Sequence, residues 1–272
     1  AVPPCGRSYT STMTRAASSS SGSVVSALLA FGDQLDAIEA NRLATVLTDN
    51  EPANELLVTD PWGFLCGVIC DYQMPADRAW ATPYNLSERL GGWSPEIVAS
   101  RPADVRKAFL GPPAIHRFPN QTSGFVIAGA RRVIAEYDGE ADAVWNDEPT
   151  ARELQARLIE FKGISQKKAA MAVEILYAQF GVPIRDMQGS DIAYDVHVRR
   201  VMLRAGLADR DDIDHMVVRA RTLHPERTGD LDLPMWEIGR TWCHQSDPDC
   251  DACVIIDACP RLVAAAANVR GA

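Results

Sequence analysis

Four of the seven cysteines in this sequence lie close together near its carboxyl end and could hold a metal centre. They are Cys243, Cys250, Cys253 and Cys259, in the spacing C-x6-C-x2-C-x5-C. Four thiolates in one compact loop can bind Zn²⁺ or a [4Fe–4S] cluster. A structural zinc site usually has two C-x2-C pairs separated by a longer insert, whereas this loop has one pair flanked by single cysteines. The spacing therefore favours a [4Fe–4S] cluster, with zinc and then disulfides as the alternatives.

A pair of lysines follows a glycine turn between two predicted helices within residues 158–176. Gly163 can adopt the positive φ of a tight turn, and Ser165 is expected to cap the second helix, whose free N–H groups could bind a phosphate. Lys167 and Lys168 would lie in the first turn of that helix, where a cation is unfavourable. A lysine partly desolvated there would have a lowered pKa, as a nucleophilic amine requires. Taken alone, such a turn is more often structural than functional, and two solvated lysines are the simpler interpretation.

Further along the chain, Asp195 occupies the position of a helix N-cap. An apolar stripe of Val198, Val201 and Met202 follows it at helical spacing, which predicts a helix that begins after this aspartate. On its own, a capping aspartate needs no other role, and His197 is most simply a packed or capping histidine.

The elements that must position these residues are predicted to be helical almost throughout, so the expected fold class is all-α. Helices are expected at residues 24–47 (interrupted near Gly32 and Asp33), 62–69, 87–90, 94–99, 102–110, 124–137 and 150–161. Asp60 and Pro61 are typical of an N-cap and a first helical residue. Thr150 and Glu153 match a capping box. No stretch alternates between apolar and polar residues with hairpin turns at its ends, so no major sheet is expected.

The composition is ordinary for a globular protein, and the net charge is −9. Such an acidic balance argues against a nucleic-acid partner, because phosphate binding relies on Lys and Arg. Charge acts locally, however, and residues 155–204 contain eight basic residues against five acidic ones. No run of about 18 apolar residues is present, so no membrane span is expected. Residues 1–23 are expected to be a disordered Ser/Thr-rich tail, with an organellar transit peptide as the alternative, and residues 263–272 a frayed tail.

These elements occur in an order that resembles the endonuclease III family of helix-hairpin-helix (HhH-GPD) DNA glycosylases. The order is the hairpin, the motif D-x-H-V-x-R-V at residues 195–201, the sequence Gly239-Arg240-Thr241-Trp242-Cys243 and the cysteine loop. The resemblance covers roughly residues 24–262. It implies two all-α lobes. A six-helix barrel lobe would contain residues 58–185 with the hairpin, and a cluster lobe would combine residues 186–262 with N-terminal helices at 24–57.

The resemblance also implies roles for single residues. Lys167 matches the Schiff-base lysine, Asp195 the catalytic aspartate, and Gln73 the glutamine that fills the gap left by a flipped base. The cysteines match the ligands of the [4Fe–4S] cluster. Further contacts with DNA are expected from Gly163, Ser165, Lys168, His197 and Arg199. His116, Arg117 and Phe118 occupy the segment from which the family inserts a second wedge, and the register does not choose among them.

The resemblance implies a base-excision repair glycosylase with AP-lyase activity that acts on double-stranded DNA containing a damaged, mismatched or modified base. The expected protein is a monomer with no membrane partner, found in the bacterial cytoplasm with the nucleoid or in a eukaryotic nucleus or organelle. One alternative is a monofunctional glycosylase in which Asp195 activates water. Others are a non-catalytic iron–sulfur protein that binds damaged DNA and a zinc-bound structural module.

Three of the sequence's departures from the family's pattern bear on the DNA contacts and the base pocket. The cluster loop, which usually presents cations to DNA, carries Asp247, Asp249 and Asp251. Residues 183–190 form an apparent insertion that could reshape the base pocket. Ile159 stands where enzymes of pyrimidine damage tend to have glutamate, so an oxidised pyrimidine is only the default substrate.

Overall fold

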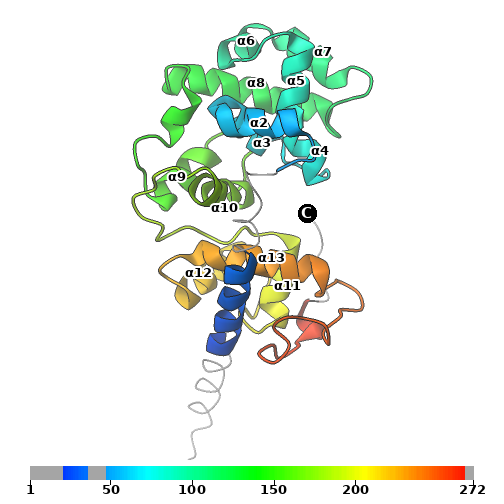
Figure 1. Cartoon of the computed structure of the whole chain (residues 1–272), viewed down its shortest axis with the longest axis vertical. Helices are drawn as coiled ribbons and strands as arrows, with labels where there is room; N and C mark the ends of the chain where they lie inside the picture. The colour runs from blue at the N-terminus through cyan, green and yellow to red at the C-terminus, as the bar shows by residue number, and fades with distance from the viewer. Residues whose placement is uncertain (1–20, 36–46, 267–272) are drawn as a thin grey trace, which may run out of the picture. The chain divides into compact units, whose positions relative to one another are not determined.

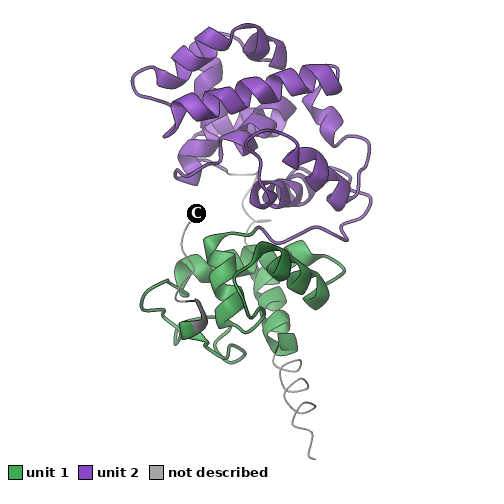
Figure 2. Cartoon of the chain, turned by 180° about the vertical axis from the view of Figure 1, so that it is seen from behind, with its two compact units in different colours: residues 1–41, 194–272 green, residues 42–193 purple. Residues whose placement is uncertain are grey.

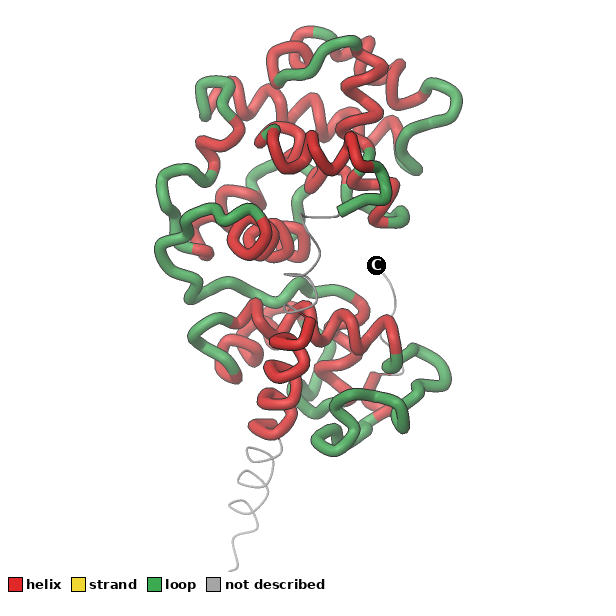
Figure 3. Tube along the Cα trace, in the orientation of Figure 1, coloured by secondary structure: helices red, strands yellow, loops and turns green. Residues whose placement is uncertain are grey.

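The computed structural model describes residues 21–35 and 47–266. These residues form helices joined by loops (Figure 1 and Figure 3). Within them, the only β-type pairing is an isolated parallel bridge between Thr150 and Asp186. The predicted all-α fold class is therefore confirmed. No helix of the described residues is both long and apolar enough to cross a membrane.

The chain divides into two compact units, which are coloured separately in Figure 2. Unit 1 comprises residues 1–41 and 194–272, and unit 2 comprises residues 42–193. The hairpin with its two lysines belongs to unit 2, whereas Asp195 and the cysteine loop belong to unit 1.

Unit 2 is a bundle of mostly short helices. They are α2(Glu51–Thr59), α3(Pro61–Cys70), α4(Ala76–Trp80), α5(Thr82–Leu90), α6(Pro95–Ser100), α7(Pro102–Leu110), α8(Pro119–Glu136), the 3₁₀ helix η1(Ala141–Val144), α9(Ala151–Ile159), α10(Gln166–Glu174) and the π-helical turn η2(Ile175–Gln179).

Helix α3 forms the centre of this bundle. Asp60 caps it by accepting a hydrogen bond from the backbone N–H of Trp62 at 2.9 Å, with Pro61 as the first helical residue. Every residue from Trp62 to Cys70 is buried, and the helix packs against α2, α5 and α8. The predicted buried helix and its N-cap are thus confirmed. An apolar helix buried on all sides gives unit 2 a fixed core, and its carboxyl end carries the residues that precede Gln73.

Unit 1 contains a helix at residues 21–35 together with α11(Val196–Arg204), α12(Ile213–Leu223), the 3₁₀ helices η3(Thr228–Leu231) and η4(Val263–Ala266), and α13(Asp232–Thr241). Helices α11 and α13 approach closely because Gly239 has no side chain. A Cβ atom at Gly239 would lie 2.5 Å from the Cβ of His197. The Phe31 ring lies 5.9 Å from that of Trp242, which joins the N-terminal helix to the end of α13.

Several predicted helix limits were wrong. The predicted helix at 87–90 is the end of α5, which begins at Thr82. Residues 21–35 are helical without a break at Gly32 and Asp33, and the helix includes residues 21–23, which were assigned to the tail. Gly32 allows the ring of Pro234 to approach, because a Cβ at Gly32 would lie 3.1 Å from the Pro234 Cγ. The predicted helix at 124–137 begins earlier, with Pro119 as its first residue. Residues 263–266 of the predicted frayed tail form the 3₁₀ helix η4. Residues 1–20, 36–46 and 267–272, which belong to the predicted tails and to the predicted helix at 24–47, lie outside the described residues.

Candidate nucleic-acid interface and candidate metal centre

The predicted hairpin is present in unit 2. Helix α9 begins with the predicted capping box, in which the Thr150 hydroxyl accepts from the Glu153 N–H at 3.2 Å and the Glu153 carboxylate accepts from the Thr150 N–H at 2.8 Å. Gly163 has a φ of 95° in the turn between α9 and α10. Ser165 is the N-cap residue of α10, but its side chain makes no capping hydrogen bond within the described part of the chain. The capping bond predicted for Ser165 is therefore wrong, and the first N–H groups of α10 are not covered by this hydroxyl.

Substituting Gly163 by alanine should damage the hairpin severely. The φ of 95° is unfavourable for any L side chain, and the new Cβ would lie 2.6 Å from a ring carbon of Phe125. Strain and overpacking together are expected to cost about 3 kcal/mol of unfolding free energy. Gly181→Ala is the matched control, because Gly181 also has a positive φ of 64° but its Cβ would meet no atom within 4 Å. It should cost about 1 kcal/mol in urea unfolding. Equal losses in the two variants would contradict this account of the turn.

Of the two adjacent lysines, Lys168 is the buried one. Its side chain is 5% exposed, and its Nζ donates to the carbonyl oxygens of Ile69 at 2.9 Å and of Gly163 at 2.8 Å. Burial, with a smaller effect of the Lys167 charge, lowers the pKa of Lys168 to about 8. Lys167 is half-buried. The lowered pKa expected for a lysine at this helix start is thus found at Lys168, whose amino group binds two carbonyls.

Gln73 lies in the loop after α3, in a left-handed backbone conformation with a φ of 45°. Arg117 donates to its carbonyl oxygen at 3.1 Å, and the Gln73 amide donates to the Tyr72 hydroxyl at 3.3 Å. The side chain of Gln73 is exposed. The loop therefore fixes the backbone of Gln73 and presents its amide to solvent.

The structure separates the three residues of the second candidate wedge. His116 is 1% exposed, and its Nδ1 accepts from the N–H of Phe118 at 2.9 Å. Its Nε2 therefore carries the proton and donates to the Cys70 carbonyl at 2.9 Å. Burial, together with the charges of Lys168 and Arg78, lowers the pKa of His116. This buried, hydrogen-bonded ring is not available as a wedge.

Arg117 is exposed and lies over the ring of Phe118 at 5.3 Å, and that ring packs at 5.4 Å from Tyr72. Arg117 and Phe118 remain as candidates for insertion into DNA.

In unit 1, Asp195 is the N-cap of α11, as predicted. Its Oδ1 accepts from the His197 N–H at 2.7 Å, and the residue is 9% exposed. The His197 ring is 3.0 Å from the Arg200 guanidinium, and its Cβ faces Gly239. The packed interpretation of His197 agrees with these contacts.

Arg199, expected to contact DNA, is engaged within unit 1. Its guanidinium donates to both carboxylate oxygens of Asp211, at 2.8 and 2.5 Å, and lies 4.6 Å over the ring of Tyr194. The Tyr194 hydroxyl donates to the same carboxylate at 2.9 Å. This charge pair raises the pKa of Arg199 and lowers that of Asp211. The ion pair would have to open before Arg199 could make a bidentate bond to phosphate.

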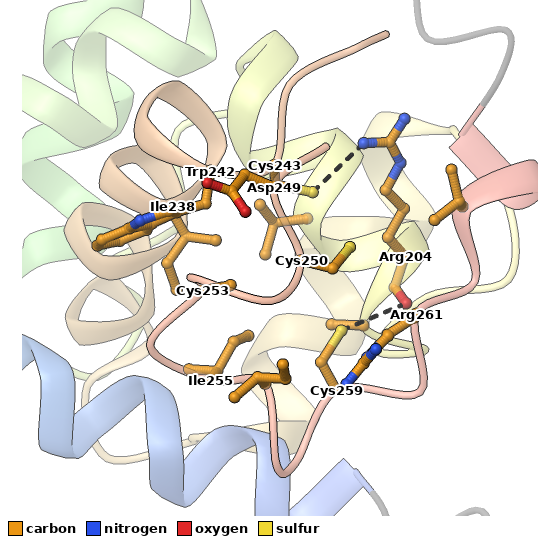
Figure 4. Close-up of a pocket in the computed structure, with 14 residues that line it drawn as sticks. Arg204, Ile238, Trp242, Cys243, Asp249, Cys250, Cys253, Ile255, Cys259 and Arg261 are labelled. Atoms are coloured by element: carbon orange, nitrogen blue, oxygen red, sulfur yellow. Dashed lines mark hydrogen bonds between the residues drawn. The ribbon is translucent and has the colours of Figure 1, made fainter. Parts of the chain in front are cut away.

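All four loop cysteines line one pocket in unit 1 (Figure 4). Helices α11 and α13 provide its other walls, through residues such as Val201 and Ile238. Burial, with smaller effects of the neighbouring cysteines, raises the pKa of the Cys253 and Cys259 thiols. Metal binding would deprotonate these thiols and release protons.

Arg204 connects the two ends of the cysteine loop. Its guanidinium donates to Cys243 Sγ at 3.5 Å and to the carbonyls of His244 and Gln245 at 2.6 and 2.9 Å. Its own carbonyl accepts from Cys259 Sγ at 3.8 Å (Figure 4). This role of Arg204 was not predicted from the sequence. The available signal was the position of Arg204 one helical turn after Arg200, which donates to the Cys243 carbonyl at 2.5 Å.

The donor set fits a cluster better than it fits a single ion. In the part of the chain that is described, no three His, Cys, Asp or Glu side chains converge closely enough to hold one metal ion. A cubane needs a different arrangement, because each cysteine binds its own iron and the four thiolates surround a volume. Four cysteines around one pocket, with a guanidinium beside a sulfur, satisfy that requirement.

The apparent insertion at residues 183–190 packs on α9. The carbonyl of Asp186 accepts from the Ala151 N–H at 2.8 Å, and the carbonyl of Gly189 accepts from the buried amide of Gln155 at 3.0 Å. Slightly further on, Gln166 in the first turn of α10 donates to the Ile192 carbonyl at 2.8 Å. Residues 183–190 are therefore bound to α9, and Ile192 just after them is bound to α10. Sequence reasoning missed the two glutamines, Gln155 and Gln166, that make these bonds.

The described helices have the helix-hairpin-helix arrangement of DNA glycosylases. An endonuclease III trapped in a covalent intermediate with DNA matches with a TM-score of 0.57 and 19% identity, over 82% of this chain and 90% of that one. A non-covalent endonuclease III–DNA complex matches at 0.56 and 20%, over 76% and 86%. A thermostable thymine-DNA glycosylase matches at 0.57 and 17%, over 90% and 97%. The fold that the resemblance implied is thus the fold of this chain.

Sequence comparison gives one distant relative, an adenine DNA glycosylase of Arabidopsis thaliana. It is 26% identical over 141 residues, which are 50% of this chain and 19% of the plant protein. The match thus spans about a fifth of the length of that relative. No family model matches the chain.

Proposed function

We propose that this chain is a DNA glycosylase of base-excision repair that removes a damaged or modified base from duplex DNA and then cleaves the strand as an AP lyase. The observation that carries the proposal is the glycosylase fold with a lysine in the first turn of the second hairpin helix and a buried aspartate at the N-cap of α11. The endonuclease III in the trapped complex is covalently joined to DNA, which requires a nucleophile, and Lys167 is the corresponding candidate in this chain.

The chemistry requires the base to leave the helical stack, because its glycosidic bond cannot be reached inside a duplex. As the C1′–N bond breaks, positive charge develops on the deoxyribose, and the carboxylate of Asp195 stabilises it. The amine of Lys167 attacks C1′ with its lone pair, and the electron pair of the broken bond leaves with the base, which takes up the proton that the amine loses. Opening of the sugar ring gives an imine, and loss of the C2′ proton with departure of the 3′ phosphate nicks the strand.

A second candidate is a monofunctional glycosylase in which Asp195 activates water and Lys167 only contacts phosphate. The observation that favours it comes from the comparisons. An adenine DNA glycosylase and a thymine-DNA glycosylase are similar to this chain as well as endonuclease III, and of these three proteins only endonuclease III is seen covalently joined to DNA. The two candidates share the first bond cleavage and differ in whether the enzyme becomes covalently attached to the sugar.

The experiment that tests the proposal offers the protein a panel of duplexes, each with one damaged, mismatched or methylated base. Base release is measured by chromatography, and strand cleavage is measured with and without alkali. The proposed function predicts release from at least one duplex and nicking without alkali. Release with nicking only after alkali would support the monofunctional enzyme. Binding to such duplexes without release of any base would contradict both.

We also propose that Cys243, Cys250, Cys253 and Cys259 hold a [4Fe–4S] cluster. The pocket that they share, with Arg204 against Cys243, supports this assignment. The cluster would stabilise the loop because its four cysteines would all be bonded to one inorganic core. The chain's own residues would perform the base chemistry.

Cys250→Ser should remove most of the iron from the purified protein, because three thiolates remain to hold a cluster that needs four ligands. Iron and acid-labile sulfide are measured per chain, together with the broad visible absorbance, and the wild type should contain about four irons. Cys66→Ala is the control, since Cys66 is fully buried in α3 of unit 2. This control should keep the iron. Wild-type protein with zinc and no iron would contradict the assignment.

A further inference from the structure

The carboxyl end of α3 is capped by side chains that come from distant parts of unit 2. The last carbonyls of a helix lack partners within the helix. Here the Asp71 N–H donates to the carbonyls of Gly67 and Val68, at 3.0 and 3.4 Å, which leaves the carbonyls of Ile69 and Cys70. The Lys168 Nζ donates to the Ile69 carbonyl at 2.9 Å, although the two residues are 99 positions apart in the chain. The His116 Nε2 donates to the Cys70 carbonyl at 2.9 Å, across 46 positions.

The amino group of Lys168 also binds the hairpin. A lysine has three donors, and Lys168 uses one on the end of α3 and a second on the Gly163 carbonyl in the turn, at 2.8 Å. The same Nζ lies 5.8 Å over the ring of Tyr72. A single buried amine therefore connects the hairpin turn with the end of α3 and with the loop that follows it.

That loop contains Gln73. Its backbone leaves α3 at Asp71 and reaches the left-handed conformation at Gln73, where Arg117 holds the carbonyl at 3.1 Å. Since His116 precedes Arg117, one short segment binds both the end of α3 and the Gln73 loop. The hairpin turn, the Gln73 loop and residues 116–118 are thus joined through four hydrogen bonds to backbone carbonyls.

We propose that Lys168 is a positioning residue whose amino group locks the hairpin turn to the end of α3, so that the start of α10 and the Gln73 side chain keep the spacing needed to hold a flipped nucleotide. The proposal rests on the proposed function for its use of that spacing. The lock itself is a property of the free protein.

The titration of Lys168 gives this lock a distinctive pH dependence. The charged or titratable groups that face it are Asp71, Cys70 and Tyr72 from the end of α3, His116 from the segment before α8, and Lys167 on its own helix. Burial lowers the pKa of Lys168 from 10.5 to about 8 in the folded protein. Between these two values, unfolding takes up a proton, so the contribution of Lys168 to stability rises with pH and is absent from a variant without the amine.

The experiment compares the wild type with Lys168→Met, which keeps the length of the side chain and removes its donors. Amide hydrogen exchange of the free protein at pH 7 should be at least tenfold faster in the variant at residues 71–74. In single-turnover excision at saturating DNA, the rate should fall at least tenfold while the affinity for DNA changes by less than threefold. Lys107→Met removes an exposed lysine of α7 and should match the wild type in both measurements.

Urea unfolding from pH 7 to 10 supplies the third reading. The ratio of the wild-type to the Lys168→Met folding constant should increase by up to tenfold per pH unit above about pH 8. Equal exchange at residues 71–74 in the two proteins, or a ratio independent of pH, would overturn the lock. Altered exchange with an unchanged excision rate would overturn the positioning role. If the wild type excises no base, the proposed function fails, and the exchange and unfolding results still decide whether Lys168 forms the lock.

Discussion

Asp195→Asn is expected to lower the rate of base excision by about 10³-fold while unit 1 stays folded. The asparagine retains an oxygen that can accept from the His197 N–H, which Asp195 binds at 2.7 Å, so the N-cap of α11 is kept. The negative charge is lost, and with it the electrostatic stabilisation of the cation that develops on the sugar. Single-turnover base release measures the rate, and circular dichroism on heating measures the fold.

Asp212→Asn is the matched control for that substitution. Asp212 is the N-cap of α12 in the same unit, and its Oδ1 accepts from the His215 N–H at 2.9 Å. The chemical change and the local structure are the same, so a loss caused by weaker capping would occur in both variants. Undiminished excision by Asp195→Asn would remove this carboxylate from the mechanism. If neither variant nor the wild type excises a base but all bind damaged DNA, the chain is a sensor.

Lys167→Met is expected to abolish strand nicking without alkali and the covalent adduct with DNA. Borohydride reduces an imine between lysine and sugar to a stable amine, so the wild type should give an adduct that migrates with the combined mass of protein and DNA. Without the Lys167 amine, no imine forms. Lys107→Met is the control, because Lys107 is an exposed lysine of α7 in the same unit, and this variant should keep the adduct. If Lys167→Met still releases the base at the wild-type rate, water is the nucleophile and the monofunctional mechanism holds.

The helix starts at Asp60 and Thr150 could be predicted because their caps depend on neighbours in the sequence. Thr150 with Glu153, and Asp60 with Pro61, bind or shape the backbone within one helical turn, so their types and spacing suffice. The cysteine loop is predictable for the same reason, since its donors are adjacent in the chain. Asp195 was predicted as a cap on this basis, whereas the catalytic role proposed for it comes only from the resemblance.

Contacts between distant residues could not be predicted in this way. Nothing near Lys168 in the sequence indicates that its amine binds Ile69, 99 residues away. Helical spacing did contain a signal. Lys168 lies on the same helix face as Ala172 and Ile175, which are buried, so its amino group needs a hydrogen-bond partner inside the protein. The interruption predicted at Gly32 failed for a related reason. Gly32 does not break its helix; because it has no side chain, the ring of Pro234 in α13 can pack against it, and this contact is between distant residues.

The acidic residues of the cysteine loop depart from the pattern that the resemblance implies. Asp251 pairs at 3.5 Å with Arg261, and both side chains are largely exposed, so this ion pair contributes little to stability. Unit 2, in contrast, has exposed cations: Arg117 lies beside the Gln73 loop, and Lys162 lies in the hairpin turn. The hairpin is thus the more favourable of the two surfaces for DNA.

Peptide mapping of the borohydride-reduced complex tests the account most directly. The wild-type protein is incubated with the duplex from which it releases a base, reduced, digested and analysed by mass spectrometry for the residue that carries the sugar. The account predicts attachment at Lys167. Attachment at any other residue, or base release with no attachment, would contradict it.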